Sequence, residues 1–382
     1  MSPIMGPALQ QFDRAFVRYR GRILVYFGGC DYFRLASHPD VLAAARDATV
    51  RYGLNVAASR ATTGNHSLYL KLEYELARFF EVDRALLTPS GYATNLVAAQ
   101  GMAGHVAHAL IDEQAHASLA DAAELLGCQV HRFRHLSPSD LAERLRRLPD
   151  AARPLVLTDG LFAREGTIAP LADYLRLLPR NGLLLVDDAH GAAVLGSNGR
   201  GTPEICGVRR ENRLIQTCTL SKAFGTYGGA ILGNAPLIGR IVRQSRQFAG
   251  STPLPPPLAA AALKAVQIVR SDPGLRSRLA DRVRLVKDAL CKTALAQPQT
   301  PSPVIAVQAC TAPAAARLRR DLLRRGIYPS LIRYPGGPPG GYFRFALSSE
   351  HTREQLNALS ASLLSVPGLA ALGGNNTTQR RI

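Results

Sequence analysis

Short apolar runs alternate with helical patterns along the middle of the chain. Six runs are rich in apolar and β-branched residues and predict strands: 85–88, 107–111, 129–133, 155–158, 183–186 and 214–219. Because helical stretches separate them, the pattern indicates an α/β fold with a mainly parallel sheet and crossover helices. Before these runs we predict an N-terminal helix, a strand at 23–27 and a helix that begins at Pro39.

The same pattern suggests how the chain divides. We predict an N-terminal segment (1–50), a large domain (51–257) and a smaller α+β C-terminal domain (258–372) that opens with a bridging helix after a proline cluster. The polar residues 373–382 are expected to form a disordered tail. With 382 residues, 47% of them hydrophobic, the chain is long enough to bury the large core that this division requires.

The formal net charge is +18, and arginines gather in the helical stretches 140–148 and 314–326. We interpret most of this charge as a solvated surface, and the rest as attraction for anionic substrates such as coenzyme A thioesters or for an acidic carrier protein. No recognised nucleic-acid-binding motif accompanies the charge, so we expect no nucleic-acid partner.

The six cysteines show no C-x-x-C pair and no zinc-like spacing with histidine, which speaks against a metal site or a disulfide framework. We therefore expect a reducing, cytoplasmic compartment. No signal peptide and no membrane-spanning run is recognised.

Candidate chemistry centres on Lys222, which lies between the run 214–219 and a glycine-rich turn. A buried lysine needs an acidic partner or a Schiff base with a carbonyl cofactor; the alternative is a lysine that reaches into water from a strand end. The run 183–186 ends in Asp187, and His190 follows. Carboxyl ends of parallel strands form ligand sites, so we expect a shared cofactor site in which Asp187 faces a protonated pyridine nitrogen. Taken singly, Asp187 could be a helix N-cap and His190 a core histidine.

Several motifs in a fixed order carry a resemblance to a known family. They are DYFRLASHP (31–39), SRATTGNHSLYLKLE (59–73), SGYATN (90–95), AHASL (115–119), TDGLFAREG (158–166), VDDAHG (186–191) and TLSKAFG (219–225). The chain thereby resembles the α-oxoamine synthases, which are class II acyltransferases of fold type I that depend on pyridoxal 5'-phosphate (PLP). The resemblance covers about residues 31–351.

The resemblance implies a role for each matching residue. Lys222 would bind PLP covalently, Asp187 would face its ring nitrogen, His190 would contact its phenolic oxygen, and His116 would stack on its ring. The phosphate would be bound by small and hydroxyl-bearing residues, namely Ser90, Gly91, Tyr92 and Thr219. Ser251 and Thr252 would reach that phosphate from a second subunit, which implies a homodimer with shared active sites. Arg344 would hold the substrate carboxylate.

The reaction implied is a decarboxylative condensation of a small amino acid with an acyl thioester on coenzyme A or an acyl carrier protein, which yields an α-amino ketone. The motifs are most similar to the 8-amino-7-oxononanoate synthase branch. Glycine C-acetyltransferase, serine palmitoyltransferase and secondary-metabolite synthases are the rival branches. From other classes, an aminotransferase would share Lys222 and Asp187, and a silent partner subunit of a heterodimer would be expected to lack the lysine.

Four positions depart from the family pattern. Cys30 replaces an asparagine, Arg34 a glycine, Tyr69 a histidine and Ala163 a serine. No role is assigned to Cys30, Tyr69 or Ala163. The departures leave the amino acid, the acyl chain and the pathway open.

Overall fold

The computed structural model describes residues 6–333 and 338–372, which form two compact units. Among the described residues, the larger unit comprises 38–162 and 168–273, and the smaller comprises 6–37, 163–167, 274–333 and 338–372. The predicted tail at 373–382 lies outside the described residues. Within those residues, no helix combines the length and the apolar character that crossing a membrane requires.

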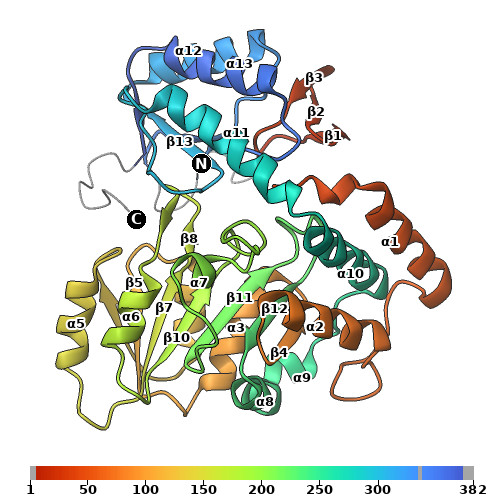
Figure 1. Ribbon diagram of the computed structural model, residues 1–382, viewed down its shortest axis with the longest axis vertical. Coiled ribbons are helices and arrows are strands. Elements are labelled where there is room, and N and C mark those ends of the chain that lie inside the picture. The colour runs from red at the N-terminus through yellow and green to blue at the C-terminus, as the bar shows by residue number, and fades with distance from the viewer. Residues whose placement is uncertain (1–5, 334–337, 373–382) are drawn as a thin grey trace. The chain divides into compact units, whose positions relative to one another are not determined.

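A seven-stranded sheet organises the larger unit (Figure 1). Its strands, in spatial order, are β4 (Arg84–Thr88), β12 (Gly229–Gly233), β11 (Leu214–Thr219), β10 (Leu183–Asp187), β7 (Pro154–Asp159), β5 (His108–Asp112) and β6 (Gln129–Phe133). All run parallel except β12, which is antiparallel to both of its neighbours. The six predicted strands are therefore confirmed.

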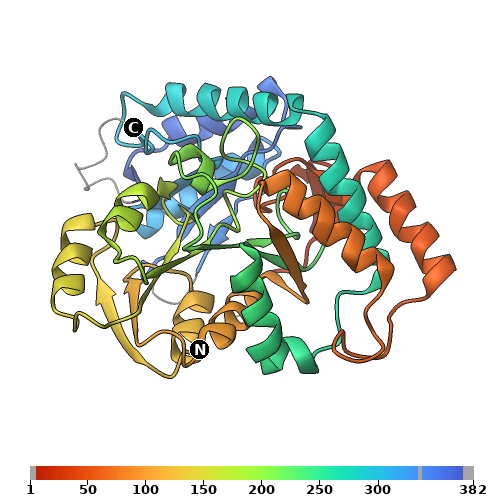
Figure 2. The same cartoon turned by 60° about the horizontal axis from the view of Figure 1, so that its bottom comes forward.

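Helices cover both faces of this sheet, as Figures 1 and 2 show. The helices of the larger unit are α1 (Pro39–Tyr52), α2 (Ser67–Phe80), α3 (Gly91–Met102), α4 (Ala117–Glu124), α5 (Pro138–Arg146), α6 (Leu171–Leu177), α7 (Thr202–Ile205), α8 (Ala235–Gln244), α9 (Arg246–Gly250) and α10 (Pro256–Ser271). The predicted helix start at Pro39 is confirmed. Helix α10 packs on α1 and α2, so it belongs by packing to the larger unit rather than opening the smaller one.

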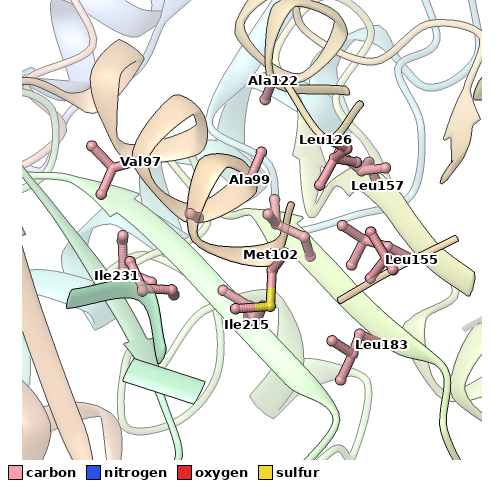
Figure 3. Packing of buried hydrophobic residues seen from close by; sticks show 14 of the residues in the cluster. Val97, Ala99, Met102, Ala122, Leu126, Leu155, Leu157, Leu183, Ile215 and Ile231 are labelled. Atoms are coloured by element: carbon pink, nitrogen blue, oxygen red, sulfur yellow. The ribbon is translucent and has the colours of Figure 1, made fainter. Parts of the chain in front are cut away.

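Two apolar layers hold these helices to the sheet. Helix α3 lies across one face, and Figure 3 shows its Met102 side chain directed at Ile215 of β11. On the opposite face, residues of α5 and α6 pack around Tyr174. The central strands are apolar on both faces because helices bury both of them. A rigid sheet edge results, from which short loops project.

In the described part of the smaller unit there are two antiparallel sheets and three helices. One sheet comprises β1 (Gln10–Asp13), β2 (Phe16–Tyr19) and β3 (Arg22–Val25); the other comprises β14 (Leu331–Ile332), β15 (Tyr342–Ala346), β13 (Val304–Ala309) and β16 (Leu369–Ala371). The helices are α11 (Gly274–Leu290), α12 (Ala312–Arg324) and α13 (Arg353–Leu364), with a short 3-10 turn at Leu35–Ser37. The short strands β8 (Leu161–Phe162) and β9 (Thr167–Ile168) pair with each other on either side of residues 163–166.

The N-terminal helix prediction is wrong, because that segment forms β1 and β2 instead, whereas the strand predicted at 23–27 corresponds to β3. Arg20 and Gly21 both have positive φ angles, 48° and 75°, and they turn the chain between β2 and β3. Along β2, buried Val17 and Tyr19 alternate with exposed Arg18. This two-residue period fits a strand that is buried on one side.

Candidate active site

The candidate site lies where the parallel strands of the larger unit end. Because β12 is antiparallel to both β4 and β11, those two strands run in the same direction as β10, β7 and β5. The carboxyl ends of all five strands therefore meet at one edge of the sheet. Asp187 is the last residue of β10, and the other predicted residues follow strand ends, so the topology brings all of them to that edge: Ser90, His116, His190 and Lys222.

Lys222 follows β11, in a turn that folds back into β12. The turn is closed by hydrogen bonds from Leu220 N to Gly228 O (2.9 Å) and from Thr226 N to Leu220 O (2.8 Å). Gly228 has φ +99°, a conformation that side chains disfavour. The half-buried Lys222 ammonium lies with Nζ 2.7 Å from Nε2 of His190. Since an ammonium only donates, Nε2 accepts in this arrangement.

Asp187, the last residue of β10, is 8% exposed, and two groups donate hydrogen bonds to it. Its carboxylate accepts from Asn95 Nδ2 at 2.6 Å and from the Ala189 amide at 3.0 Å. Asn95 is fully buried in α3; its Nδ2 also donates to Ser118 Oγ (2.9 Å), and its Oδ1 accepts from Thr217 Oγ1 (2.6 Å). This network holds the carboxylate in one orientation.

Sequence reasoning assigned no role to Asn95. The residue closes the SGYATN motif and is a polar side chain within an otherwise mostly apolar buried helix face. A buried polar group of this kind needs partners, and this was the available signal.

His116 caps α4 and faces the same network. Its Nδ1 accepts from the Ser118 amide at 3.2 Å and lies 2.8 Å from Ser118 Oγ, while its own amide donates to Asp159 at 2.8 Å. Burial lowers the pKa of His116, with the nearby Lys222 charge acting in the same direction. Burial and the Asp187 charge raise the pKa of Asp159 well above its ordinary value. Asp159 was likewise not predicted as a site residue, although it lies in the TDGLFAREG motif.

The second aspartate of the VDDAHG motif braces the loop that carries His190. Asp188 is fully buried and accepts from the Thr202 amide (2.9 Å), Thr202 Oγ1 (2.6 Å) and Gln216 Nε2 (2.7 Å). Burial raises the pKa of Asp188 to about 7. These contacts tie the loop to the next strand, β11.

The N-terminus of α3 offers a place for an anionic group. Ser90 caps this 12-residue helix, and the amides of Gly91 and Tyr92 lie ahead of its first internal hydrogen bond. A Cβ atom on Gly91 would lie 2.7 Å from Thr219 Oγ1, so only glycine allows this approach. Thr219 Oγ1 is also 2.7 Å from Ser221 Oγ, which adds a second hydroxyl.

The chemical groups at this sheet edge fit PLP. The cofactor carries a phosphate, a ring nitrogen that takes a proton and an aldehyde, and the edge supplies helix amides, an oriented carboxylate and a lysine amine. The rings of Tyr92 and His116 lie edge to face, with centroids 6.1 Å apart.

Three predicted residues are not part of this cluster of contacts. Ser251 and Thr252 follow α9 in the larger unit, and their predicted contact with a phosphate in a second subunit stays a prediction. Arg344 lies on β15 of the smaller unit, where its Nη2 is 3.9 Å from Cys30 Sγ. It forms no ion pair with any described residue.

The fold and these groups define a PLP-dependent transferase, and comparisons with known proteins agree. The aminotransferase class I and II family matches residues 24–363. The 8-amino-7-oxononanoate synthase of Xylella fastidiosa is 37% identical over 347 residues, which cover 90% of this chain and 86% of that protein. The enzyme of the same name from Thioalkalivibrio sulfidiphilus is 36% identical over 345 residues, with 90% and 88% coverage.

Solved structures give the same picture. Serine palmitoyltransferase of Sphingomonas wittichii has a TM-score of 0.86 at 28% identity, and the match covers 94% of each chain. The enzyme from S. paucimobilis, solved with a bound PLP–myriocin aldimine, has a TM-score of 0.86 at 28% identity, with 94% and 92% coverage. The 8-amino-7-oxononanoate synthase of Francisella tularensis has a TM-score of 0.75 at 26% identity, with 90% and 98% coverage.

The chain therefore belongs to the aminotransferase class I and II family and, within it, to the α-oxoamine synthases, which are PLP-dependent acyltransferases. Its fold is the type I fold of PLP-dependent transferases.

Proposed function

We propose that this α-oxoamine synthase condenses a small amino acid with an acyl thioester, with loss of carbon dioxide and of the thiol, to give an α-amino ketone. The reaction of 8-amino-7-oxononanoate synthase, in which alanine condenses with a pimeloyl thioester, is the best single assignment. The 2.7 Å approach of Lys222 Nζ to His190 Nε2, beside an oriented Asp187, is the observation that carries the PLP-dependent chemistry of this proposal. Relatives of that name that are 34–37% identical support the assignment.

Each residue at the sheet edge has a separate role in the proposed reaction. Bound PLP supplies an electron sink for the pair left on the amino acid Cα. Lys222 removes and returns the proton at that Cα, because its amine is held at the strand end. Asp187 keeps a proton on the ring nitrogen, and Asn95 keeps its carboxylate aimed. His116 covers one face of the ring.

The remaining contacts are proposed from the family pattern. The amides of Gly91 and Tyr92, with Ser90 and Thr219, bind the phosphate. Ser251 and Thr252 of a second subunit complete that binding, so the active unit is a homodimer. His190 contacts the phenolic oxygen of PLP.

Arg344 binds the carboxylate of the amino acid. The planar guanidinium suits a carboxylate, and the absence of an ion pair to any described residue leaves its charge available for one. The six free cysteines suit a reducing compartment, and we propose a cytoplasmic location.

A serine palmitoyltransferase-like reaction is the second candidate. It is favoured by the higher TM-score of those structures, 0.86 against 0.75 for the Francisella tularensis synthase. The two reactions differ in the amino acid and in the acyl chain, so substrate panels separate them.

The test measures thiol release from acyl-CoA of several chain lengths, with PLP and with alanine, glycine or serine. We expect release to require one amino acid and to be abolished in Lys222→Ala, with Lys222→Arg as a charge-matched control. Formation of a keto acid without thiol release would instead identify an aminotransferase. Failure of the wild-type protein to change the visible absorption of added PLP would favour a silent partner subunit.

A further inference from the structure

The positive charge of the chain is concentrated in the smaller unit. The described residues of that unit include 20 lysines and arginines against 8 aspartates and glutamates, whereas the larger unit carries 24 against 20. Of the net charge of +18, +12 thus belongs to the described residues of the smaller unit and +4 to the larger unit. A general enrichment in arginine would raise both units alike, so the imbalance needs a local explanation.

Six exposed arginines form what we call the basic surface: Arg20, Arg22, Arg317, Arg319, Arg320 and Arg324. The last four lie on the solvent side of α12, whose other side buries Leu318 and Leu322. Arg20 lies in the turn between β2 and β3 and Arg22 begins β3, and this hairpin is joined to α12 by a hydrogen bond from Arg22 Nη2 to Leu323 O at 2.7 Å. Helix and turn therefore present one connected surface.

Acidic side chains do little to neutralise this surface. Asp321 is the single acid of α12; it is 7% exposed and accepts from Arg324 (2.8 Å) and Arg325 (2.9 Å). Arg317, Arg319 and Arg320 form no ion pair with a described residue. A helix dipole favours bases in the last turn, which accounts for Arg324 but not for Arg317.

We propose that the basic surface docks an acidic carrier protein that delivers the acyl group as a thioester. This inference rests on the proposed function, because that reaction consumes a thioester held either by coenzyme A or by a protein. The phosphates of coenzyme A need one compact group of bases. The 13 residues of α12 instead extend over about 20 Å, a length that matches a helix of a partner protein. Complementary charge accelerates such encounters and makes them sensitive to salt.

The test compares two donors of the same acyl group: a purified bacterial acyl carrier protein and coenzyme A. The basic-surface variant is Arg317→Gln, Arg319→Gln and Arg320→Gln together. The control variant changes three exposed arginines of the larger unit that also form no ion pair with described residues, Arg132, Arg146 and Arg180, to glutamine. Glutamine keeps the helix propensity of arginine.

We expect kcat/KM with the carrier-protein donor to fall about tenfold or more at low salt in the basic-surface variant, in line with electrostatic steering. Its kcat/KM with the coenzyme A donor and both values of the control variant should stay unchanged. Equal activity of wild type and basic-surface variant on the carrier-protein donor would overturn the proposal, and so would equal losses with both donors.

A binding measurement separates this inference from the proposed function. If the wild-type protein releases no thiol from either donor, the proposed reaction is wrong. Docking is then judged by fluorescence anisotropy of labelled, unloaded carrier protein. Weaker binding in the basic-surface variant than in the control variant supports docking, and equal binding refutes it. Tighter binding of a duplex RNA than of the carrier protein would also refute it, in favour of a nucleic-acid partner.

Discussion

Arg34 stands where the family pattern has glycine, and the backbone explains the usual glycine. Its φ angle is +54°, in the left-handed region, and only 4% of the residue is exposed. The guanidinium donates to Tyr26 O through Nη2 (2.7 Å) and to Ser348 Oγ through Nε (3.2 Å). These bonds join the segment after β3 to the turn after β15, so the side chain compensates for an unfavourable backbone.

Two substitutions separate the side chain from the backbone. Arg34→Ala and Arg34→Gly both lose the two hydrogen bonds from a charged donor, and we expect each to cost about 1–3 kcal/mol in the free energy of unfolding. Only alanine retains the left-handed strain of about 1–2 kcal/mol. The greater unfolded-state entropy of glycine offsets about 0.5–1 kcal/mol of that advantage. The glycine variant should therefore be the more stable of the two by about 0.5–1 kcal/mol.

Urea unfolding followed by circular dichroism measures this order of stability. A second readout is His351, whose pKa is lowered to about 3 by burial and by the Arg34 charge. NMR titration should show the pKa of His351 higher in both variants than in wild type. An alanine variant at least as stable as the glycine variant, or an unchanged His351 pKa, would refute this account of Arg34.

Three further predictions concern charge and packing. Burial lowers the pKa of Lys287 from 10.5 to about 7, so the unfolded chain binds more protons between these values and the stability contribution should rise with pH across that window. Lys287→Met should flatten this rise in urea unfolding measured from pH 7 to 10; an unchanged slope contradicts it. Gly91→Ala should weaken PLP retention by about 1–3 kcal/mol in equilibrium dialysis, because its Cβ would lie 2.7 Å from both Cβ and Oγ1 of Thr219; retention equal to that of wild type would contradict this. Asn95→Ala should lower kcat by more than its loss of thermal stability explains, since Asp187 loses its fixed donor. If kcat falls only in step with thermal stability in both Asn95→Ala and Asn95→Asp, this would speak against an orienting role.

The sequence predicts those features of the fold that a single local pattern determines. Each predicted strand is an apolar run between polar turns, and a parallel sheet buried on both faces demands that pattern. The positions of Lys222 and Asp187 at strand ends followed from the same runs. The 2.7 Å contact between Lys222 and His190 joins two of the predicted residues directly.

The features that were not predicted depend mostly on contacts between residues far apart in the sequence. Asn95 meets Asp187 and Thr217 only after α3 has packed on the sheet, so no spacing along the chain relates the three. At the N-terminus, the helix prediction missed the turn at Arg20 and Gly21 that joins β2 to β3. The strand β12 was not predicted, because its glycines lack strand propensity and its sequence looks like a continuation of the glycine-rich turn before it.

The antiparallel strand β12 has a consequence for how the protein folds. It joins β11 to β4, so Thr88 pairs with Gly229 across a long separation in sequence. The helix N-terminus after β4 and the lysine after β11 come together only when this non-local pairing closes. Such closures are slow, because chain entropy is lost before contacts form. During refolding, helical circular dichroism should therefore recover before the protein regains the ability to bind its cofactor.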